Sequence, residues 1–211
     1  MSVRLVLATH NRHKLVELRA ILLPAVPDLS ADDLGTSADV GAPDVPETGV
    51  TFAENALLKA RALAAHTGLP AVADDSGLCV DVLGGAPGVF SARWAGTHGD
   101  DAANLALLLA QLSDVPTEHR RAHFECAAAL VTPDGVEHVR RGTLPGRLTT
   151  APRGTGGFGY DPILVPDAQP PRAADAPLTS AELTADEKNA ISHRGEAFRA
   201  LAPLIAEVLR G

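Results

Sequence analysis

Residues 70–96 read PAVADDSGLCVDVLGGAPGVFSARWAG, and the rest of the chain is organised around this stretch. Its apolar start, 71–73, predicts a short buried strand that runs directly into Asp74, Asp75 and a turn at 76–77. Burying a carboxylate is costly unless it is paired or binds a metal. Because side chains alternate along an extended chain, we expect the two acids to face opposite ways, one structural and one facing a cleft. The alternative is that both acids only end the strand and cap a turn.

The composition indicates a globular protein with a sizeable core. With 211 residues, 45% of them hydrophobic, we expect residues 1–211 to form a single domain with two closely joined lobes. A formal net charge of -8 argues against a nucleic-acid or membrane-surface binder, but not against a nucleotide substrate. Cys79 and Cys126 lie in apolar runs and are interpreted as core residues in a reducing compartment, not as a disulfide or metal site. Without a long apolar segment or signal peptide, the sequence predicts a soluble, cytoplasmic protein.

The N-terminal segment offers a candidate anion site. Residues 3–8 predict a central strand, and a helix follows in which 15–22 carry apolar residues at helical spacing. Arg12, His13 and Lys14 fall in the first turn of that helix, where cations oppose the helix dipole by roughly 0.3–1 kcal/mol each. A bound phosphate would turn this unfavourable contribution of the three cations into a favourable one. The alternative is a solvated basic turn.

The next segment combines an expected loop with a well-marked helix. Residues 24–46 are rich in Pro, Asp and Gly and predict a loop with little fixed structure. Thr51 and Glu54 then match a capping box, which predicts a helix from there to about residue 66. Lys59 lies on this helix and by itself indicates only a solvated face.

The middle of the chain reads as strands joined by a hairpin. A strand is expected over 78–82, and residues 122–130 alternate strictly between apolar and polar. The turn at 133–135 leads into a second strand over 136–143, which predicts a hairpin. The histidines on this hairpin are interpreted as its polar face: His119, His123 and His138.

A glycine-rich loop at 154–159 matches the pattern G-x-G-x-x-G without its structural context. A dinucleotide fingerprint must open a helix, whereas here the strand-like run 163–165 follows. A loop that carries Phe158, Tyr160 and Asp161 is more typical of the wall of a base pocket. The alternative is a mobile surface loop.

The C-terminal segment predicts a final helix with a proline inside it. Thr184 is expected to cap a short helix, and residues 192–195 open the last one. Pro203 removes a backbone donor, so we expect it to kink or split that helix.

Five motifs occur in order along essentially the whole chain. They are Thr9-x-Asn11-x-x-Lys14, Glu47-Thr48-Gly49 with Phe52-x-Glu54-Asn55-Ala56, Ala73–Gly77 with its continuation through Arg93, Gly157–Pro162 and Ser192–Gly195. Together they resemble the inosine triphosphate pyrophosphatase family, the bacterial dITP/XTP pyrophosphatases, with His10 standing where glycine is common among relatives.

The resemblance implies an α/β fold with a long mixed β-sheet flanked by helices and two lobes around a central cleft, usually as a homodimer. It implies Mg²⁺-dependent hydrolysis of deaminated purine nucleoside triphosphates (ITP, dITP, XTP) to the monophosphate and pyrophosphate. This activity would keep such bases out of DNA and RNA. A site that demands a 6-keto oxygen leaves a donor unpaired when an amino purine enters, which would exclude ATP.

The resemblance also implies a role for individual residues. Asp75 would be the general base, and Glu47 and Asp75 would hold the metal. The implied substrate-binding residues are Thr9, His10, Asn11, Arg12, His13, Lys14 and Ser76 near the phosphates, Phe158, Gly159, Tyr160 and Asp161 near the nucleoside, and Lys188, His193 and Arg194 at the purine's 6-keto edge.

Two other function classes remain open from the residues alone. The chain could bind a nucleotide without turning it over, although intact Glu47, Asp75 and Lys14 argue against this. It could also be a phosphoryl-transfer enzyme or a serine hydrolase. No G-x-x-x-x-G-K-[ST] loop or G-x-S-x-G elbow occurs, and Ser76 has no histidine base in its own motif.

Overall fold

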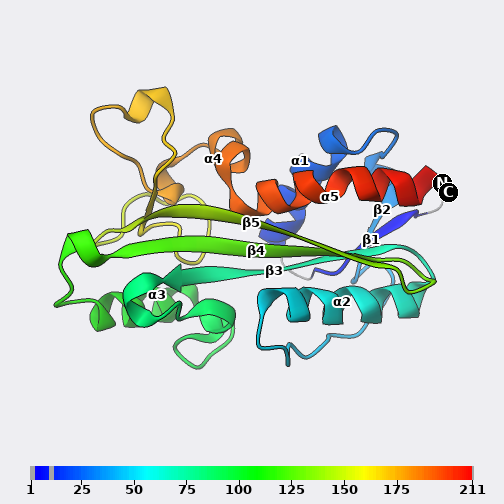
Figure 1. The fold of residues 1–211 in the computed structure, drawn as a ribbon, viewed down its shortest axis with the longest axis horizontal. Helices are drawn as coiled ribbons and strands as arrows, with labels where there is room; N and C mark the ends of the chain where they lie inside the picture. Colours follow the sequence, from blue (N-terminus) through cyan, green and yellow to red (C-terminus); the bar gives the residue numbers. More distant parts are fainter. Residues whose placement is uncertain (1–2, 10–11, 211) are drawn as a thin grey trace. The chain divides into compact units, whose positions relative to one another are not determined.

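The computed structural model describes residues 3–9 and 12–210, leaving aside the side chains of residues 12 and 13. The described chain forms a six-stranded sheet in the order β2-β1-β3-β4-β5-β6 (Figure 1). β1 pairs in parallel with β2 and β3, whereas β5 and β6 pair antiparallel, so the sheet is mixed. The strands are β1 Leu5–Leu7, β2 Leu34–Thr36, β3 Ala71–Val80, β4 Arg121–Val131, β5 Glu137–Leu148 and β6 Leu164–Pro166. The predicted α/β class with a mixed sheet is therefore confirmed.

Five α-helices accompany these strands in the described part of the chain, and none of them is long and apolar enough to cross a membrane. The helices are α1 Arg12–Ala25, α2 Phe52–Thr67, α3 Asp101–Gln111, α4 Ala185–Ile191 and α5 His193–Arg210. Pro203 lies within α5 without splitting it, so that part of the prediction was wrong.

The chain divides into two compact units, and the division falls within β3, β4 and β5. The first unit comprises residues 1–75, 126–142 and 194–211. The second comprises residues 76–125 and 143–193.

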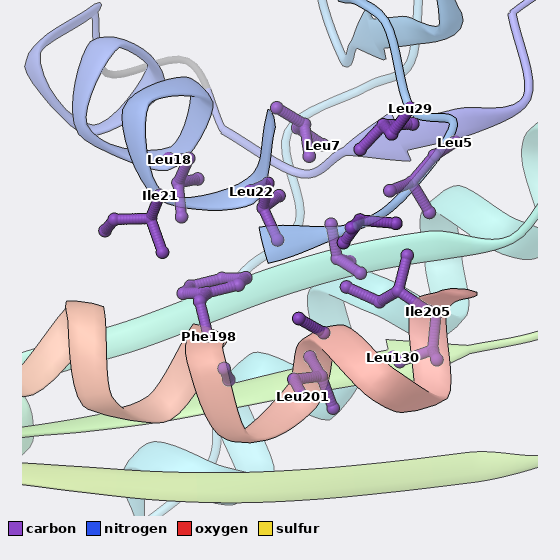
Figure 2. Packing of buried hydrophobic residues seen from close by; sticks show 14 of the residues in the cluster. Leu5, Leu7, Leu18, Ile21, Leu22, Leu29, Leu130, Phe198, Leu201 and Ile205 are labelled. Atoms are coloured by element: carbon purple, nitrogen blue, oxygen red, sulfur yellow. The ribbon is translucent and has the colours of Figure 1, made fainter. Parts of the chain in front are cut away.

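In the first unit, α1 and α5 share a core with β1 and the adjoining parts of β3 and β4. Figure 2 shows Phe198 of α5 pointing toward Leu18 and Leu22 of α1. α2 lies across the strands from α5 (Figure 1) and buries Phe52 on its inner side. Two helical layers therefore enclose the strands of this unit.

The N-terminus of α2 is formed as the sequence predicts. The Thr51 hydroxyl accepts the backbone N–H of Glu54 at 3.2 Å, and the Glu54 carboxylate accepts the N–H of Thr51 at 3.1 Å. Gly68 ends the helix in the left-handed conformation at φ 66°. These reciprocal caps fix the first turn of α2. The helix carries Asn55 and Lys59, two residues of the site described below.

The segment 24–46 was wrongly expected to lack regular structure, because β2 lies within it and pairs with β1. β2 is only three residues long and contains Gly35, so neither periodicity nor strand propensity marks it. A Cβ at Gly35 would lie 2.9 Å from a Val3 side-chain carbon. The glycine is thus explained by close packing, which the sequence alone does not reveal.

The expected turn at 76–77 is also absent, because β3 continues from Ala71 to Val80. A Cβ at Gly77 would lie 2.4 Å from the Ser91 hydroxyl and 2.5 Å from the Gly88 carbonyl oxygen. Gly77 therefore serves a close approach within the second unit, and the strand carries both acids in extended conformation.

The second unit has its own core around the remaining parts of β3, β4 and β5. Leu108 and Leu112 of the α3 segment and Tyr160 of the glycine-rich loop contribute to it. The glycine-rich loop is followed by β6 and not by a helix. This agrees with the expectation that the G-x-G-x-x-G match is not a dinucleotide-binding site. The hairpin between β4 and β5 also forms, with the turn closed by a hydrogen bond from the Thr132 N–H to the Val136 carbonyl.

Candidate active site

Asp74 and Asp75 contact different helices, as the alternation along β3 predicts. The Asp75 carboxylate accepts a hydrogen bond from Asn55 Nδ2 at 3.0 Å, and Asn55 lies on α2. The Asp74 carboxylate instead contacts Lys14 of α1 and Arg194 of α5. The strand therefore presents one acid to each helical layer of the first unit.

Glu47 and Asp75 converge on the ammonium group of Lys59. Lys59 Nζ lies 2.6 Å from Glu47 Oε1 and 3.8 Å from Asp75 Oδ1. The loop that carries Glu47 is tied to α2, because the Gly49 N–H donates to Asn55 Oδ1 at 2.8 Å. Asn55 thus contacts both the loop and Asp75, which holds the two carboxylates near one cation.

The charges in this cluster oppose one another. Burial raises the pKa of Asp75, as does Glu47, while Lys59 and the Asn55 hydrogen bond act in the opposite direction. Burial by itself would lower the pKa of Lys59, but Asp75 and Glu47 outweigh it and raise that pKa. Lys59 is therefore a charged, largely buried group, and its interpretation as a solvated face was wrong. The i, i+4 spacing from Asn55 to Lys59, on one helix face, is the signal that could have identified it.

The two carboxylates fit a divalent metal by their chemistry. Mg²⁺ prefers oxygen ligands and is commonly held by one or two carboxylates together with substrate phosphates. Glu47 and Asp75 already share one cation, so they would hold such an ion. Asn55 can orient the Asp75 oxygen that does not face Lys59.

Asp74 organises a second set of cations. Its Oδ2 accepts from Lys14 Nζ, Arg194 Nε and Arg194 Nη2, each at 3.2 Å. Arg194 Nη1 also donates to Glu17, and the arginine side chain is 2% exposed. Burial would raise the pKa of Asp74, but Lys14 and Arg194 outweigh it and hold the pKa far below its usual range. Lys14, a predicted phosphate ligand, is therefore oriented by a buried carboxylate.

The second unit brings together three of the predicted nucleoside-binding residues. Lys188 Nζ donates to Asp161 Oδ2 at 2.8 Å and lies 5.0 Å from the centre of the Phe158 ring. The Phe158 N–H donates to the same Asp161 oxygen at 2.8 Å. Gly157 has φ +72°, and a Cβ there would lie 2.1 Å from Asp161 Oδ2, so only glycine fits. The loop is thus tied to α4 and is not a structureless surface loop.

Two further predicted residues of this unit have packed side chains. Tyr160 is buried in the core and its hydroxyl donates to the Ser91 carbonyl at 2.9 Å. The His193 ring is stacked on Phe124 with centroids 5.0 Å apart. The Gly159 N–H donates to the Asp101 carboxylate at 2.8 Å. These contacts support the loop and the start of α5, while a direct role in nucleotide binding stays a prediction.

Thr9 and Ser76 are the remaining predicted residues that the structure describes. Thr9 is nearly buried just after β1, and Ser76 is half-buried on β3 directly after Asp75. His10 and Asn11, together with the side chains of Arg12 and His13, lie outside the described residues.

Known proteins resemble this chain along nearly its whole length. The model of the Ham1 family matches residues 5–204. A dITP/XTP pyrophosphatase of Streptomyces coelicolor is 66% identical over 206 residues, covering 98% of each chain. A HAM1 protein from Coxiella burnetii has a structure with TM-score 0.82 at 40% identity, covering 97% of this chain and 99% of the other. The structure of a nucleoside-triphosphatase / dITP/XTP pyrophosphatase from Mycobacterium abscessus has TM-score 0.71 at 51% identity, covering 97% of this chain and 99% of the other. The chain therefore belongs to the Ham1 family.

Proposed function

We propose that this protein hydrolyses deaminated purine nucleoside triphosphates, ITP, dITP and XTP, to the monophosphate and pyrophosphate. The observation that carries the proposal is the convergence of Glu47 and Asp75 on Lys59, with Asn55 fixing the Asp75 carboxylate. The names of the relatives supply the substrate class. The proposal includes Mg²⁺ as cofactor, a cytoplasmic homodimer and a role in clearing such nucleotides from the pool.

The carboxylates suit attack of water on the α-phosphorus. When bound, Mg²⁺ would neutralise the phosphates and polarise the reacting phosphoryl group. Asp75 would accept the proton of the attacking water, and a pKa raised by burial favours this role. Glu47 would complete the metal's protein ligands. Lys14, held by Asp74, would place positive charge beside the phosphates.

Selection for a 6-keto purine is assigned to the second unit. Phe158 offers an aromatic face for stacking, and Lys188 can donate further hydrogen bonds besides the one to Asp161. A keto oxygen would accept such a bond, whereas the amino group of adenine would leave the donor unpaired.

The proposal is tested by product analysis with ITP, dITP, XTP, GTP and ATP at saturating Mg²⁺. We expect monophosphate and pyrophosphate from the first three and little turnover of ATP. Release of orthophosphate in place of pyrophosphate would contradict the reaction. Tight binding without turnover would indicate a nucleotide-binding protein instead.

Phe158→Ala is expected to raise KM for ITP by between about 5-fold and about 140-fold. Stacking of a base on an aromatic side chain contributes about 1–3 kcal/mol, and about 1.4 kcal/mol corresponds to a factor of ten. The value of kcat should change much less, because the proposed role of the ring is to bind the base and not to take part in the reaction. The measurement is steady-state kinetics of pyrophosphate release.

Phe90→Ala is the matched control. This phenylalanine of the second unit is 53% exposed and lies under Arg93, 5.4 Å from the guanidinium carbon to the ring centre. Loss of the Phe90 ring should leave KM for ITP within about twofold of the wild-type value. Equal KM values for wild type and Phe158→Ala would remove Phe158 from the base site.

Lys59→Gln is expected to destabilise the protein by about 2 kcal/mol when divalent ions are chelated, because Glu47 and Asp75 lose their shared cation. Removing one partner of a fully buried pair costs about 3–5 kcal/mol, and these side chains are partly exposed. Added Mg²⁺ would replace the lost charge, so it should stabilise the variant more than the wild type. Urea unfolding with chelator and with Mg²⁺ measures both effects.

Arg61→Gln provides the control on the same helix. Its bidentate contact with Glu137 is exposed, so its loss should cost under about 1 kcal/mol and be independent of Mg²⁺. If Mg²⁺ stabilised wild type and Lys59→Gln equally, the carboxylate pair would not be the metal site.

A further inference from the structure

A second group of metal-ligating side chains lies in the second unit. Cys79 lies on β3, and His123 and Glu125 lie two residues apart on β4, the neighbouring strand in the sheet. One ligand atom from each side chain lies within 4.8 Å of the other two. This trio contains none of the residues assigned to the nucleotide reaction.

The alternation of both strands explains why the three side chains meet. Leu78 and Val80 of β3 pack in the core of the second unit with Phe124 of β4. Their neighbours Cys79, His123 and Glu125 must therefore point to the other face of the sheet. Adjacent strands bring side chains of one face to within about 5 Å of each other, so the cluster follows from the strand pairing itself.

The donor set is one sulfur, one nitrogen and one oxygen. Zn²⁺ accepts all three, at about 2.3 Å for Cys and about 2.0–2.2 Å for His and carboxylate, whereas Mg²⁺ takes oxygen ligands. Those bond lengths place tetrahedral ligands roughly 3.3–3.8 Å apart. Small side-chain rotations therefore suffice to close the present spacing around an ion.

We propose that Cys79, His123 and Glu125 form a binding site for a thiophilic transition-metal ion, Zn²⁺ in the first place. Three protein ligands leave a fourth position for water. The ion would link β3 to β4 on the face opposite the core of the second unit. The site is distinct in ligands and in metal preference from the Glu47 and Asp75 carboxylates, and does not depend on the proposed function.

The electrostatics of the cluster restrict which ion can bind. Burial, together with Glu125 and Asp81, raises the pKa of the Cys79 thiol to about 11. An ion must therefore displace the thiol proton, which requires strong affinity for thiolate. Bound thiolate and carboxylate would then neutralise a divalent charge in this half-buried position.

The test is a Co²⁺ titration of the chelator-treated full-length protein, since Co²⁺ reports thiolate ligation by a near-ultraviolet charge-transfer band. We expect the band in wild type, its loss on adding Zn²⁺, and no loss with a large excess of Mg²⁺. Cys79→Ser, which is nearly isosteric, should abolish it while Cys126 remains. His123→Gln should weaken Co²⁺ binding at least tenfold.

His119→Gln is the control, because His119 is exposed and outside the cluster. It should leave the titration unchanged. Zn²⁺ should also raise the melting temperature of wild type but not of Cys79→Ser. Absence of the band in wild type, or its persistence in Cys79→Ser, would overturn the proposal. If Cys79→Ser failed to fold, unaltered Co²⁺ affinity in His123→Gln would overturn it equally.

Discussion

Replacing Asp75 with asparagine is expected to lower kcat for pyrophosphate release from ITP by about 10²–10⁴-fold, the usual contribution of general-base catalysis. Asparagine keeps the size of the side chain, and its oxygen can still accept the hydrogen bond from Asn55 Nδ2. It can neither take a proton from water nor supply a charged metal ligand. The measurement is steady-state turnover at saturating Mg²⁺.

The same substitution should leave the fold intact. Burial raises the pKa of Asp75 above its ordinary value of 3.8, so the folded protein holds this proton more tightly than the unfolded chain. The stability linked to this group is present below pH 3.8 and decreases as pH rises through the folded-state pKa. At pH 7 the Asp75→Asn variant should therefore melt at the wild-type temperature or above it.

Asp81→Asn is the matched control, an exposed acid just after the same strand. It should retain wild-type turnover. Turnover near the wild-type rate in Asp75→Asn would remove Asp75 from the base role and with it the proposed mechanism.

The elements predicted well from sequence are those fixed by local chemistry. The capping box of Thr51 and Glu54 satisfies backbone groups within one turn, so it can be read without knowing the rest of the fold. The opposite facing of Asp74 and Asp75 follows from the geometry of any strand. The order of the motifs also identifies the family, which the match to the Ham1 family confirms, whereas the catalytic and metal-binding roles of Glu47 and Asp75 stay predictions.

The elements missed depend on contacts between distant segments. β2 exists because Leu34–Thr36 lies beside β1, and Gly35 and Gly77 are required by neighbours that no local pattern specifies. The charge state and burial of Lys59 arise from Glu47 and Asp75, 12 and 16 residues away. Such pairings become visible only when the helix and strand are placed together.

The Asp74→Asn variant is expected to lose about 3–5 kcal/mol of unfolding free energy, because it leaves the buried Arg194 guanidinium without its main countercharge. The substitution should also raise KM for ITP, since Lys14 loses the carboxylate that orients it. Denaturant unfolding and steady-state kinetics measure the two effects. Glu17→Gln is the control: Glu17 contacts the same arginine but is more exposed, so its loss should cost less.

The pH dependence of this loss has a definite sign. The pKa of Asp74 is lowered in the folded protein, so its contribution to stability is fully present above the unfolded value of 3.8. It is lost as pH falls toward the folded-state pKa. The difference between wild type and Asp74→Asn should thus be constant from pH 5 to 8, as these values all lie above 3.8, and shrink below it.

A double variant separates charge from packing. If the cost of Asp74→Asn comes from an uncompensated cation, adding Arg194→Met should recover much of the stability, because the buried charge is then gone. Equal losses in the single and double variants would instead assign the cost to the shape of the Asp74 pocket. Arg194 lies in the first turn of α5, and Lys14 lies in the first turn of α1. If the double variant recovered stability but not the wild-type KM for ITP, Asp74 would be identified as the residue that positions Lys14 for the triphosphate.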